Sequence, residues 1–462
     1  MAARFVNIDH DTPLLLPPDL RDWVAADHLV HFIMDAVGQL DVRAARVNER
    51  GTGDAQYPPA MMLGLLIYSY ASGVFSSRQI ERSTYENVAV RRLCADTHPD
   101  HDTLCEFRRQ NGALLSASFA QVLELAAGCG VLKVGGLTVA IDGTKVLASA
   151  SKHAAVSYER AGAQMRELEL EIGELLAKAE QADSTPLEDG LSIPEEVQRR
   201  QERKALLAKA QAEMEARAYA RAQAERPDYE QKAAAREAAR AGGKKPRGKE
   251  PQPPSETPGP KDQYNFTDPE SRIMKSAGGF EQCYNAQAAV EVESRLIVGQ
   301  QVATAPNDKE QLALTFAAIA SAAGPVREVL VDSGFVSEAA IMQLETDAAG
   351  APSGVRVLAA VGRERHGRTV RQLEKKDDPP TPGADASFGE RLAHRVATKA
   401  GRTRYKLRQQ TVEPVFGIIK EALGFRRFSL RGARKVSLEW TLISLAYNLK
   451  RLFHAGAELW PA

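Results

Sequence analysis

Three carboxylates, far apart in the chain, have the residue type and the local setting that metal-dependent chemistry requires. Asp142 ends an apolar run in LTVAIDGTKVLASAS, Asp332 ends another in REVLVDSGF, and Glu413 lies in a strongly basic segment. An acid at the end of a buried strand is costly unless it is paired or binds a cation. Carboxylates suit the hard ions Mg²⁺ and Mn²⁺. Two such ions about 3.5–4 Å apart can stabilise the attacking and leaving oxygens of a phosphoryl displacement.

Each acid also has a plainer interpretation. Asp142 and Gly143 could form a structural turn, and Glu413 could be an ordinary ion-pair partner. Between residues 404 and 428 the only other acid is Glu421, and the cations are Arg404, Lys406, Arg408, Lys420, Arg426 and Arg427. Such a segment either neutralises its glutamate or holds it against a polyanion. The choice depends on whether the fold brings the three acids together.

The element order from Leu137 onward predicts how the acids are positioned. A strand, a long insertion, two strands at QAAVEVE and LIVGQQVAT, a helix, a strand, a helix, a strand and a helix follow in turn. This order is typical of an RNase H-like α/β domain, with a mixed five-strand sheet and flanking helices. The first and fourth strands of that fold are neighbours, so Asp142 and Asp332 are expected side by side. Glu413 falls on the last helix of the core.

Residues 1–130 are predicted to form an all-helical N-terminal DNA-binding domain. Two amphipathic segments flank ADTHPDHD and predict a helix, a turn and a helix, with Asp102 or Thr103 as the cap. Arg108 and Arg109 follow on the second helix, and arginine commonly contacts phosphates and base edges. The alternative is a helical hairpin that binds nothing.

The remaining residues divide by composition. Residues 131–157 are expected to be the first part of the core. Residues 158–241, which are mostly Ala, Glu, Gln, Lys, Arg and Leu, predict a charged helical hairpin inserted after the first strand. Residues 242–263 form a Pro-, Gly- and Lys-rich linker that is expected to be disordered. Residues 264–462 complete the core and add C-terminal helices.

Composition limits the class of protein. The 462 residues carry no net charge, with 44% hydrophobic and 26% charged residues, which is ordinary for a globular protein. Four cysteines without a CxxC pair indicate neither a zinc site nor a disulfide scaffold. No signal peptide is recognisable at the N-terminus. No apolar run reaches the ~18 residues that a membrane span needs. A soluble, cytoplasmic protein is expected.

Several segments together resemble the DDE transposases of bacterial insertion sequences. Tyr405, Arg408, Glu413 and Lys420 are similar to the Tyr-Arg-Glu-Lys pattern of one group, although four residues separate Arg408 from Glu413 where three are usual. AIDGTKVLASASKH and VLVDSGF resemble the blocks around the two aspartates of that family, and TVEPVFGIIK, GFRRFSLRG and EWTLISLAYNLKRL resemble its C-terminal block. The resemblance covers most of the chain except the charged insertion and the linkers.

The resemblance implies a function and a role for each residue. Asp142, Asp332 and Glu413 would hold two Mg²⁺ or Mn²⁺ ions. Lys420, and with less support Tyr405 and Arg408, would hold phosphates of the transposon end, and Arg426 and Arg427 would add to this DNA contact. The enzyme would cut double-stranded DNA at the inverted-repeat ends and join the freed 3′-hydroxyl to target DNA, as a homodimer. A silent DNA-binding regulator derived from a transposase, or a metal-dependent nuclease, is the alternative.

Overall fold

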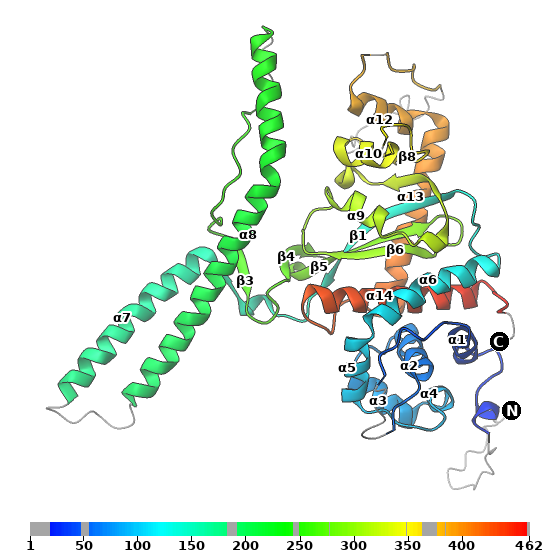
Figure 1. Cartoon of the computed structure of the whole chain (residues 1–462), viewed down its shortest axis with the longest axis horizontal. Coiled ribbons are helices and arrows are strands. Elements are labelled where there is room, and N and C mark those ends of the chain that lie inside the picture. The colour runs from blue at the N-terminus through cyan, green and yellow to red at the C-terminus, as the bar shows by residue number, and fades with distance from the viewer. Residues whose placement is uncertain are drawn as a thin grey trace, which may run out of the picture.

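A mixed sheet with helices, a bundle of N-terminal helices and a long helical arm make up the molecule (Figure 1). The computed structural model describes residues 19–47, 55–182, 192–243, 249–276, 278–347, 349–362, 377–383 and 385–459. The start of the predicted N-terminal domain (1–18), part of the predicted linker (244–248) and the last three residues lie outside the described residues.

The sheet contains all five strands that the sequence predicts, and one more. The order is β4 (Arg272–Ser276), β5 (Gly279–Glu291), β1 (Leu137–Leu147), β7 (Val326–Val331) and β8 (Arg356–Ala359), with β6 (Ile297–Ala303) paired to β5. The pairs β1–β7 and β7–β8 are parallel, whereas β5 runs antiparallel to β1, β4 and β6. The sheet is therefore mixed, and the predicted first and fourth strands, β1 and β7, are neighbours.

The sixth strand, β4, extends the edge beside β6. Cys283 of β5 pairs with Leu147 of β1 on one side and with Arg272 of β4 on the other. Asn285 pairs in the same way with Lys145 and with Ala303 of β6. Strands β4 and β6 thus lie one after the other along the same edge of β5. The sequence prediction missed β4, whose five residues RIMKS lack the apolar alternation of a half-buried strand.

Strand β1 is longer than the sequence predicts. Residues 143–147 continue to pair with β5, down to Leu147 opposite Cys283. The prediction that Asp142 ends the strand, and the alternative of a turn at Asp142 and Gly143, are therefore both wrong. The pairing with β5 extends the strand although its burial decreases after Ile141.

Two faces of the sheet receive different helices. Asp142 of β1 pairs with Ala288 of β5, which in turn pairs with Gln300 of β6, so their side chains point to the same face. On that face the side chain of Gln300 donates to Thr441 of α14 (Ala433–His454). Asp142 accepts from Arg408 of α13 (Lys399–Gly417). Gln301 points the other way, because side chains alternate along a strand, and it donates to Thr315 of α9 (Gln311–Ala317). Helices α13 and α14 thus lie on the face to which Asp142 points.

The remaining helices of the core are short. Helix α10 (Glu338–Glu345) packs against α9 and β8, and α12 (Phe388–Ala397) packs against β8 and α13. A short 3₁₀ turn (Ser333–Phe335) follows β7, and a π-helical turn (Ile418–Ala422) follows α13. Further 3₁₀ turns are Leu20–Trp23, Lys152–Ala154 and Ser321–Ala323.

The N-terminal helices share one hydrophobic core with the sheet domain. They are α1 (Leu29–Gly38), α2 (Pro59–Ala71), α3 (Ser77–Glu86), α4 (Val88–Leu93), α5 (His101–Gln110) and α6 (Gly112–Gly128). Helices α1, α2 and α6 pack against α14, and their buried side chains belong to the same cluster as those of the sheet. Asp100 caps α5 by accepting from the backbone N–H of Thr103. The sequence prediction of Asp102 or Thr103 as the cap is wrong by two or three residues.

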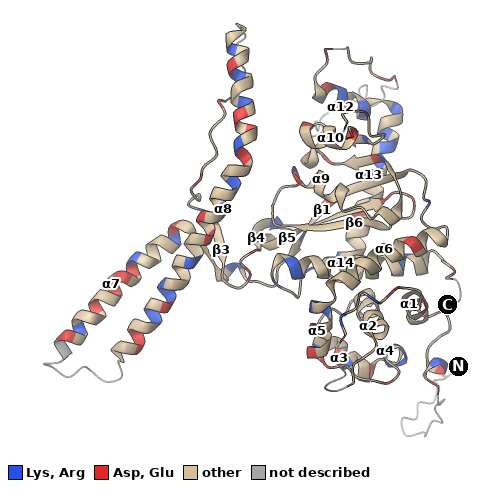
Figure 2. Cartoon of the chain, viewed as in Figure 1, with Lys and Arg blue, Asp and Glu red and all other residues tan. Residues whose placement is uncertain are grey.

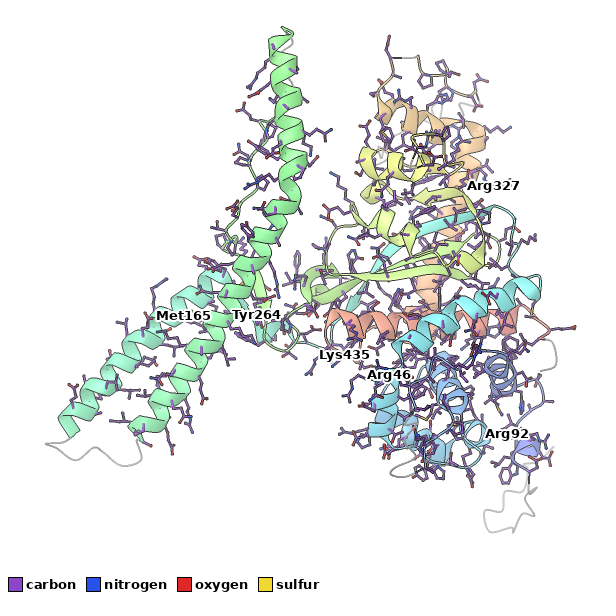
Figure 3. All side chains as sticks on the ribbon, viewed as in Figure 1. Arg46, Arg92, Met165, Tyr264, Arg327 and Lys435 are labelled. Carbon is purple, nitrogen blue, oxygen red and sulfur yellow. The ribbon has the colours of Figure 1, made fainter. Side chains whose placement is uncertain are left out.

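A two-stranded ribbon leads out of the core into the arm. Strands β2 (Ala155–Ser157) and β3 (Gln263–Asn265) pair with each other, and α7 (Tyr158–Ala182) and α8 (Ile193–Ala241) lie between them in the sequence. A second, separate hydrophobic cluster fills the base of the arm, with Tyr264 and Met165 among its members (Figure 3). Acidic and basic side chains are interspersed along both helices (Figure 2).

The predicted disordered linker is ordered where the structure describes it. Residues 249–262 run back along α8, where Glu250 pairs with Arg240 and Glu256 pairs with Arg226. The carbonyl oxygen of Lys249 also accepts a hydrogen bond from Arg236. Composition alone predicted disorder because the segment has few apolar residues, but the charged face of α8 supplies partners for its charged and backbone groups.

Candidate active site

Asp142 lies on β1, and Asp332 directly follows the neighbouring parallel strand β7. Ala140 of β1 is in parallel register with Leu330 of β7, and the two aspartates each stand two residues further along. Adjacent strands lie about 4.8 Å apart, so the register places the two residues side by side, as the sequence predicts. Asp332 directly follows β7 and caps the 3₁₀ turn, accepting from the backbone N–H of Gly334 at 2.6 Å.

Arg408 links Asp142 to Glu413. Its Nη1 lies 3.0 Å from Oδ2 of Asp142, and its Nη2 lies 3.7 Å from Oε1 of Glu413. The guanidinium side chain is only 11% exposed and that of Asp142 is 20% exposed, while that of Glu413 is 56% exposed. The glutamate is therefore the most exposed of the three side chains, and the arginine contacts both it and the mostly buried aspartate.

The surroundings of Asp142 raise the pKa of its carboxyl group. Burial raises its pKa from 3.8 to about 6. The positive charge of Arg408 and the backbone N–H of Gly143 oppose that rise, whereas the negative charges of Asp332 and Asp308 add to it. A buried carboxylate beside further acids needs additional positive charge to be stable in its ionised form.

The donor set fits a hard divalent cation, although the three acids are not gathered around one point. Within the described part of the chain, no three His, Cys, Asp or Glu side chains lie close enough to hold a single ion together. Asp142 and Glu413 nevertheless face one cationic group, and the Nε of that buried guanidinium has no hydrogen-bond partner among the described residues. Oxygen-only carboxylate donors are those that Mg²⁺ and Mn²⁺ prefer.

Lys420 lies on the π-helical turn that continues α13 and is directed back to the sheet. Its Nζ donates to the carbonyl oxygen of Lys145 in β1 at 2.8 Å. Partial burial lowers its pKa. The loop that follows is tied to the same strand, because Leu147 donates to the carbonyl oxygen of Arg426 and Phe428 donates to that of Leu147. Lys420 and the loop are thus fixed beside the strand that carries Asp142.

The other predicted phosphate contacts have partners within the chain. The hydroxyl of Tyr405 donates to the carbonyl oxygen of Val331, the residue before Asp332, at 3.1 Å. Arg426 is exposed and pairs with Glu421. Arg427 makes a long hydrogen bond of 3.5 Å to the carbonyl oxygen of Ala148. Tyr405 therefore hydrogen-bonds to the end of β7. Arg426 and Arg427 lie on the loop that follows the π-helical turn.

Arg108 and Arg109 differ from each other in the structure. Arg108 is 3% exposed and donates to the hydroxyls of Tyr70 and Ser77, so it offers no group to a phosphate. Arg109 is exposed and pairs with Glu106. The sequence contains the signal that the prediction missed, because Arg108 stands four residues after the fully buried Leu104 and so shares the buried face of α5.

A polar cluster on the opposite face of the sheet was not predicted. Oδ1 of Asp308 accepts from Asn285 at 2.6 Å, from Gln287 at 2.7 Å and from Lys145 at 3.4 Å. Gly143 packs so closely against this cluster that a Cβ there would lie 2.7 Å from Oδ1 of Asp308. The polar residues in YNAQ of β5 were the available signal, since polar side chains in a central strand need buried partners.

Comparison with known families matches both ends of the chain. A family described as Transposase domain (DUF772) matches residues 18–110, the N-terminal helices through α5. A family described as Transposase DDE domain matches residues 384–453, from α12 into α14. Neither curated proteins nor solved structures give a match.

The fold and the two family matches together indicate what class of protein this chain resembles. Both matched families are transposase domains, and the chain is similar to them at its N-terminal helices and at the C-terminal part of its mixed α/β core. The two matches together support a DDE-type transposase of an insertion sequence. No helix among the described residues combines the length and the apolar character that crossing a membrane requires.

Proposed function

We propose that this transposase binds the inverted-repeat ends of an insertion sequence and catalyses metal-dependent strand cleavage and strand transfer. Asp142, Asp332 and Glu413 would be the ligands of two Mg²⁺ or Mn²⁺ ions, on a core of the RNase H-like type. The observation that carries the proposal is the shared contact of Asp142 and Glu413 with one guanidinium, near an aspartate that directly follows the neighbouring strand.

The chain's own residues would prepare the DNA for reaction. Ions held by the three acids would acidify a water or a DNA 3′-hydroxyl and neutralise charge on the scissile phosphate. Lys420 and Arg427, beside the end of β1, would hold backbone phosphates of the element end, and Arg426 could do so after leaving Glu421. The buried side chain of Arg108 is not part of this surface.

Two wider features of the proposal concern assembly. The N-terminal helices would recognise the element ends, with Arg109 on the exposed face of α5 as one contact. Two copies of the chain would bridge the two ends of the element, and the arm of α7 and α8 would contribute to that assembly. Transposases act on DNA, so double-stranded DNA is the expected partner.

A cleavage assay with a matched control tests the catalytic assignment. The substrate is DNA carrying the sequences that flank the gene, with Mg²⁺ present. Glu413→Gln should reduce cleavage at least about a hundredfold, because a ligand of the catalytic ions is worth several kcal/mol in the transition state. Glu421→Gln, which removes the only other acid of the same basic segment, should cleave at nearly the wild-type rate. Equal activity of both variants would refute the assignment of Glu413.

The same assay separates the alternatives. A nuclease would cut the DNA without joining the freed 3′-hydroxyl to a target. A silent regulator would bind the ends, and neither the wild-type protein nor Glu421→Gln would cut them. Joined product that requires Mg²⁺ and Glu413 excludes both.

A further inference from the structure

Arg408 is placed as an internal cation of the candidate active site. It contacts the buried Asp142 and the exposed Glu413 at once, and its side chain is 11% exposed. The predicted role of Arg408 is to hold a DNA phosphate. A guanidinium that points inward to two carboxylates cannot reach a phosphate outside the site without leaving at least one of them.

The two roles compete for the same atoms. The Oδ2 of Asp142 that accepts from Arg408 is one of the oxygens that a divalent ion would bind. Charge-assisted hydrogen bonds of this kind are among the stronger ones in proteins. The Nε of Arg408 is buried and has no hydrogen-bond partner among the described residues, so this arrangement leaves the guanidinium incompletely satisfied.

We propose that Arg408 is a displaceable counter-ion, which holds Asp142 and Glu413 until divalent ions take its place and which is then free to contact DNA. The inference rests on the proposed function, because it assumes that these carboxylates bind the ions. It deepens that function by making ion binding the step that exposes one of the DNA contacts.

The opposite role makes the opposite prediction. A residue that hydrogen-bonds to metal ligands and orients them helps ion binding. Removing such a residue typically weakens metal affinity 10- to 100-fold. A competitor weakens ion binding while it is present, so its removal tightens metal affinity. The direction of the change therefore separates a displaceable counter-ion from a purely structural arginine.

The test measures ion binding by the full-length protein without DNA. Mn²⁺ is titrated at pH 8 and bound ion is followed by electron paramagnetic resonance, in the wild type, Arg408→Gln and Lys406→Gln. Lys406 is exposed on the same helix, so its variant removes an equal charge without touching the acids. Arg408→Gln should bind Mn²⁺ roughly tenfold more tightly, because one charge-assisted contact no longer competes. Lys406→Gln should stay within about twofold of the wild type, because an exposed charge is strongly screened.

A second variant keeps the test decisive if Arg408→Gln folds poorly. Arg408→Lys keeps the charge but cannot reach two carboxylates with a planar fork, so its Mn²⁺ affinity should lie between those of the wild type and Arg408→Gln. Unchanged or weaker affinity in the folded Arg408 variants overturns the inference. If Asp142→Asn removes Mn²⁺ binding from the wild type while the Arg408 variants bind no tighter, only this inference fails. If no variant binds Mn²⁺, the inference and the proposed metal site both fail.

Discussion

At Asp142, the protonation state that favours folding differs from the one that the proposed metal binding needs. Burial raises its pKa to about 6, although Arg408 opposes the rise. The folded protein therefore prefers the neutral carboxyl more strongly than the unfolded chain does. The stabilising effect of this preference is fully present below the ordinary pKa of 3.8 and is lost as the pH rises through about 6. The ionised form that the proposed metal binding needs is thus the destabilising one.

Removing this charge should stabilise the protein at high pH only. Without divalent ions, Asp142→Asn should melt above the wild type at pH 8, by up to about 3 kcal/mol of unfolding free energy for a shift of about 2 pH units. At pH 4 the two should melt alike. Thermal denaturation at several pH values measures this, with the exposed Asp102→Asn as control. A gain that does not depend on pH would contradict the assigned cause.

Gly143 should tolerate a side chain poorly. A Cβ at this position would clash with the Nε2 of Gln287 and would lie 2.7 Å from Oδ1 of Asp308. Gly143→Ala should cost about 1–3 kcal/mol, because overpacking displaces this hydrogen-bonded cluster. The control is Gly173→Ala, in the middle of α7, where nothing lies within 4 Å. It should be neutral or stabilising by about 0.5–1 kcal/mol. Chemical denaturation measures the free energy of unfolding of both variants. Equal values for the two variants would contradict the close packing at Gly143.

At the scale of residues, sequence identifies side chains more readily than their partners. The end of an apolar run singles out Asp142 and Asp332, and basic surroundings single out Glu413. The register of β1 and β7 brings the two aspartates near each other. The inward direction of Arg408 is not encoded locally, because its partner Asp142 is 266 residues away. A long-range pairing of this kind leaves no periodic pattern in the sequence.

At the scale of elements, the β2–β3 ribbon carries the chain between the core and the arm. The chain leaves through β2 and returns through β3, with Ser157 paired to Gln263 at the outer end. The arm has its own hydrophobic cluster, separate from that of the core. Two hydrogen-bonded strands whose ends face each other are the geometry that a two-residue turn closes.

Replacing the arm should leave the core folded. A variant in which Asn-Gly replaces residues 158–262 joins Ser157 to Gln263 in the observed register. Its remaining helices and sheet should melt cooperatively within a few degrees of the wild type, measured by calorimetry and circular dichroism. On DNA, it should bind one element end but fail to bridge two if the arm serves assembly, which native gel electrophoresis detects. A variant that precipitates or lacks cooperative melting would show that the arm supports the core.

Elements with strong patterns were predictable from the sequence, and those defined by pairing were not. The five apolar strands and the two long charged helices follow from periodicity and propensity. The extension of β1 beyond Asp142, the edge strand β4 and the β2–β3 ribbon depend on a partner strand distant in sequence. The order of residues 249–262 likewise depends on ion pairs with α8.

At the scale of the whole molecule, the N-terminal helices and the catalytic core are joined by a buried polar network. Glu439 of α14 is fully buried and accepts from the hydroxyl of Tyr70 at 3.1 Å, and Tyr70 in turn accepts from Arg108. Glu439 also accepts from the backbone N–H groups of Ser429 and Leu430. These two residues follow Arg426 and Arg427 with only Phe428 between them, so one side chain contacts both the N-terminal helices and the end of the basic loop.

Glu439→Ala should therefore destabilise both regions together. It removes the acceptor of two backbone N–H groups and of the Tyr70 hydroxyl, and with it a negative charge that acts on the buried Arg108. Each buried N–H group left without an acceptor costs about 1–3 kcal/mol. Glu421→Ala, whose exposed ion pair is worth at most about 1 kcal/mol, is the matched control. Hydrogen exchange should show loss of protection in α2, in α5 and at residues 426–430 in Glu439→Ala and in none of them in the control. Loss confined to α14 would mean that the N-terminal helices and the basic loop are held independently, and end recognition could then not be transmitted to the loop beside β1 through this network.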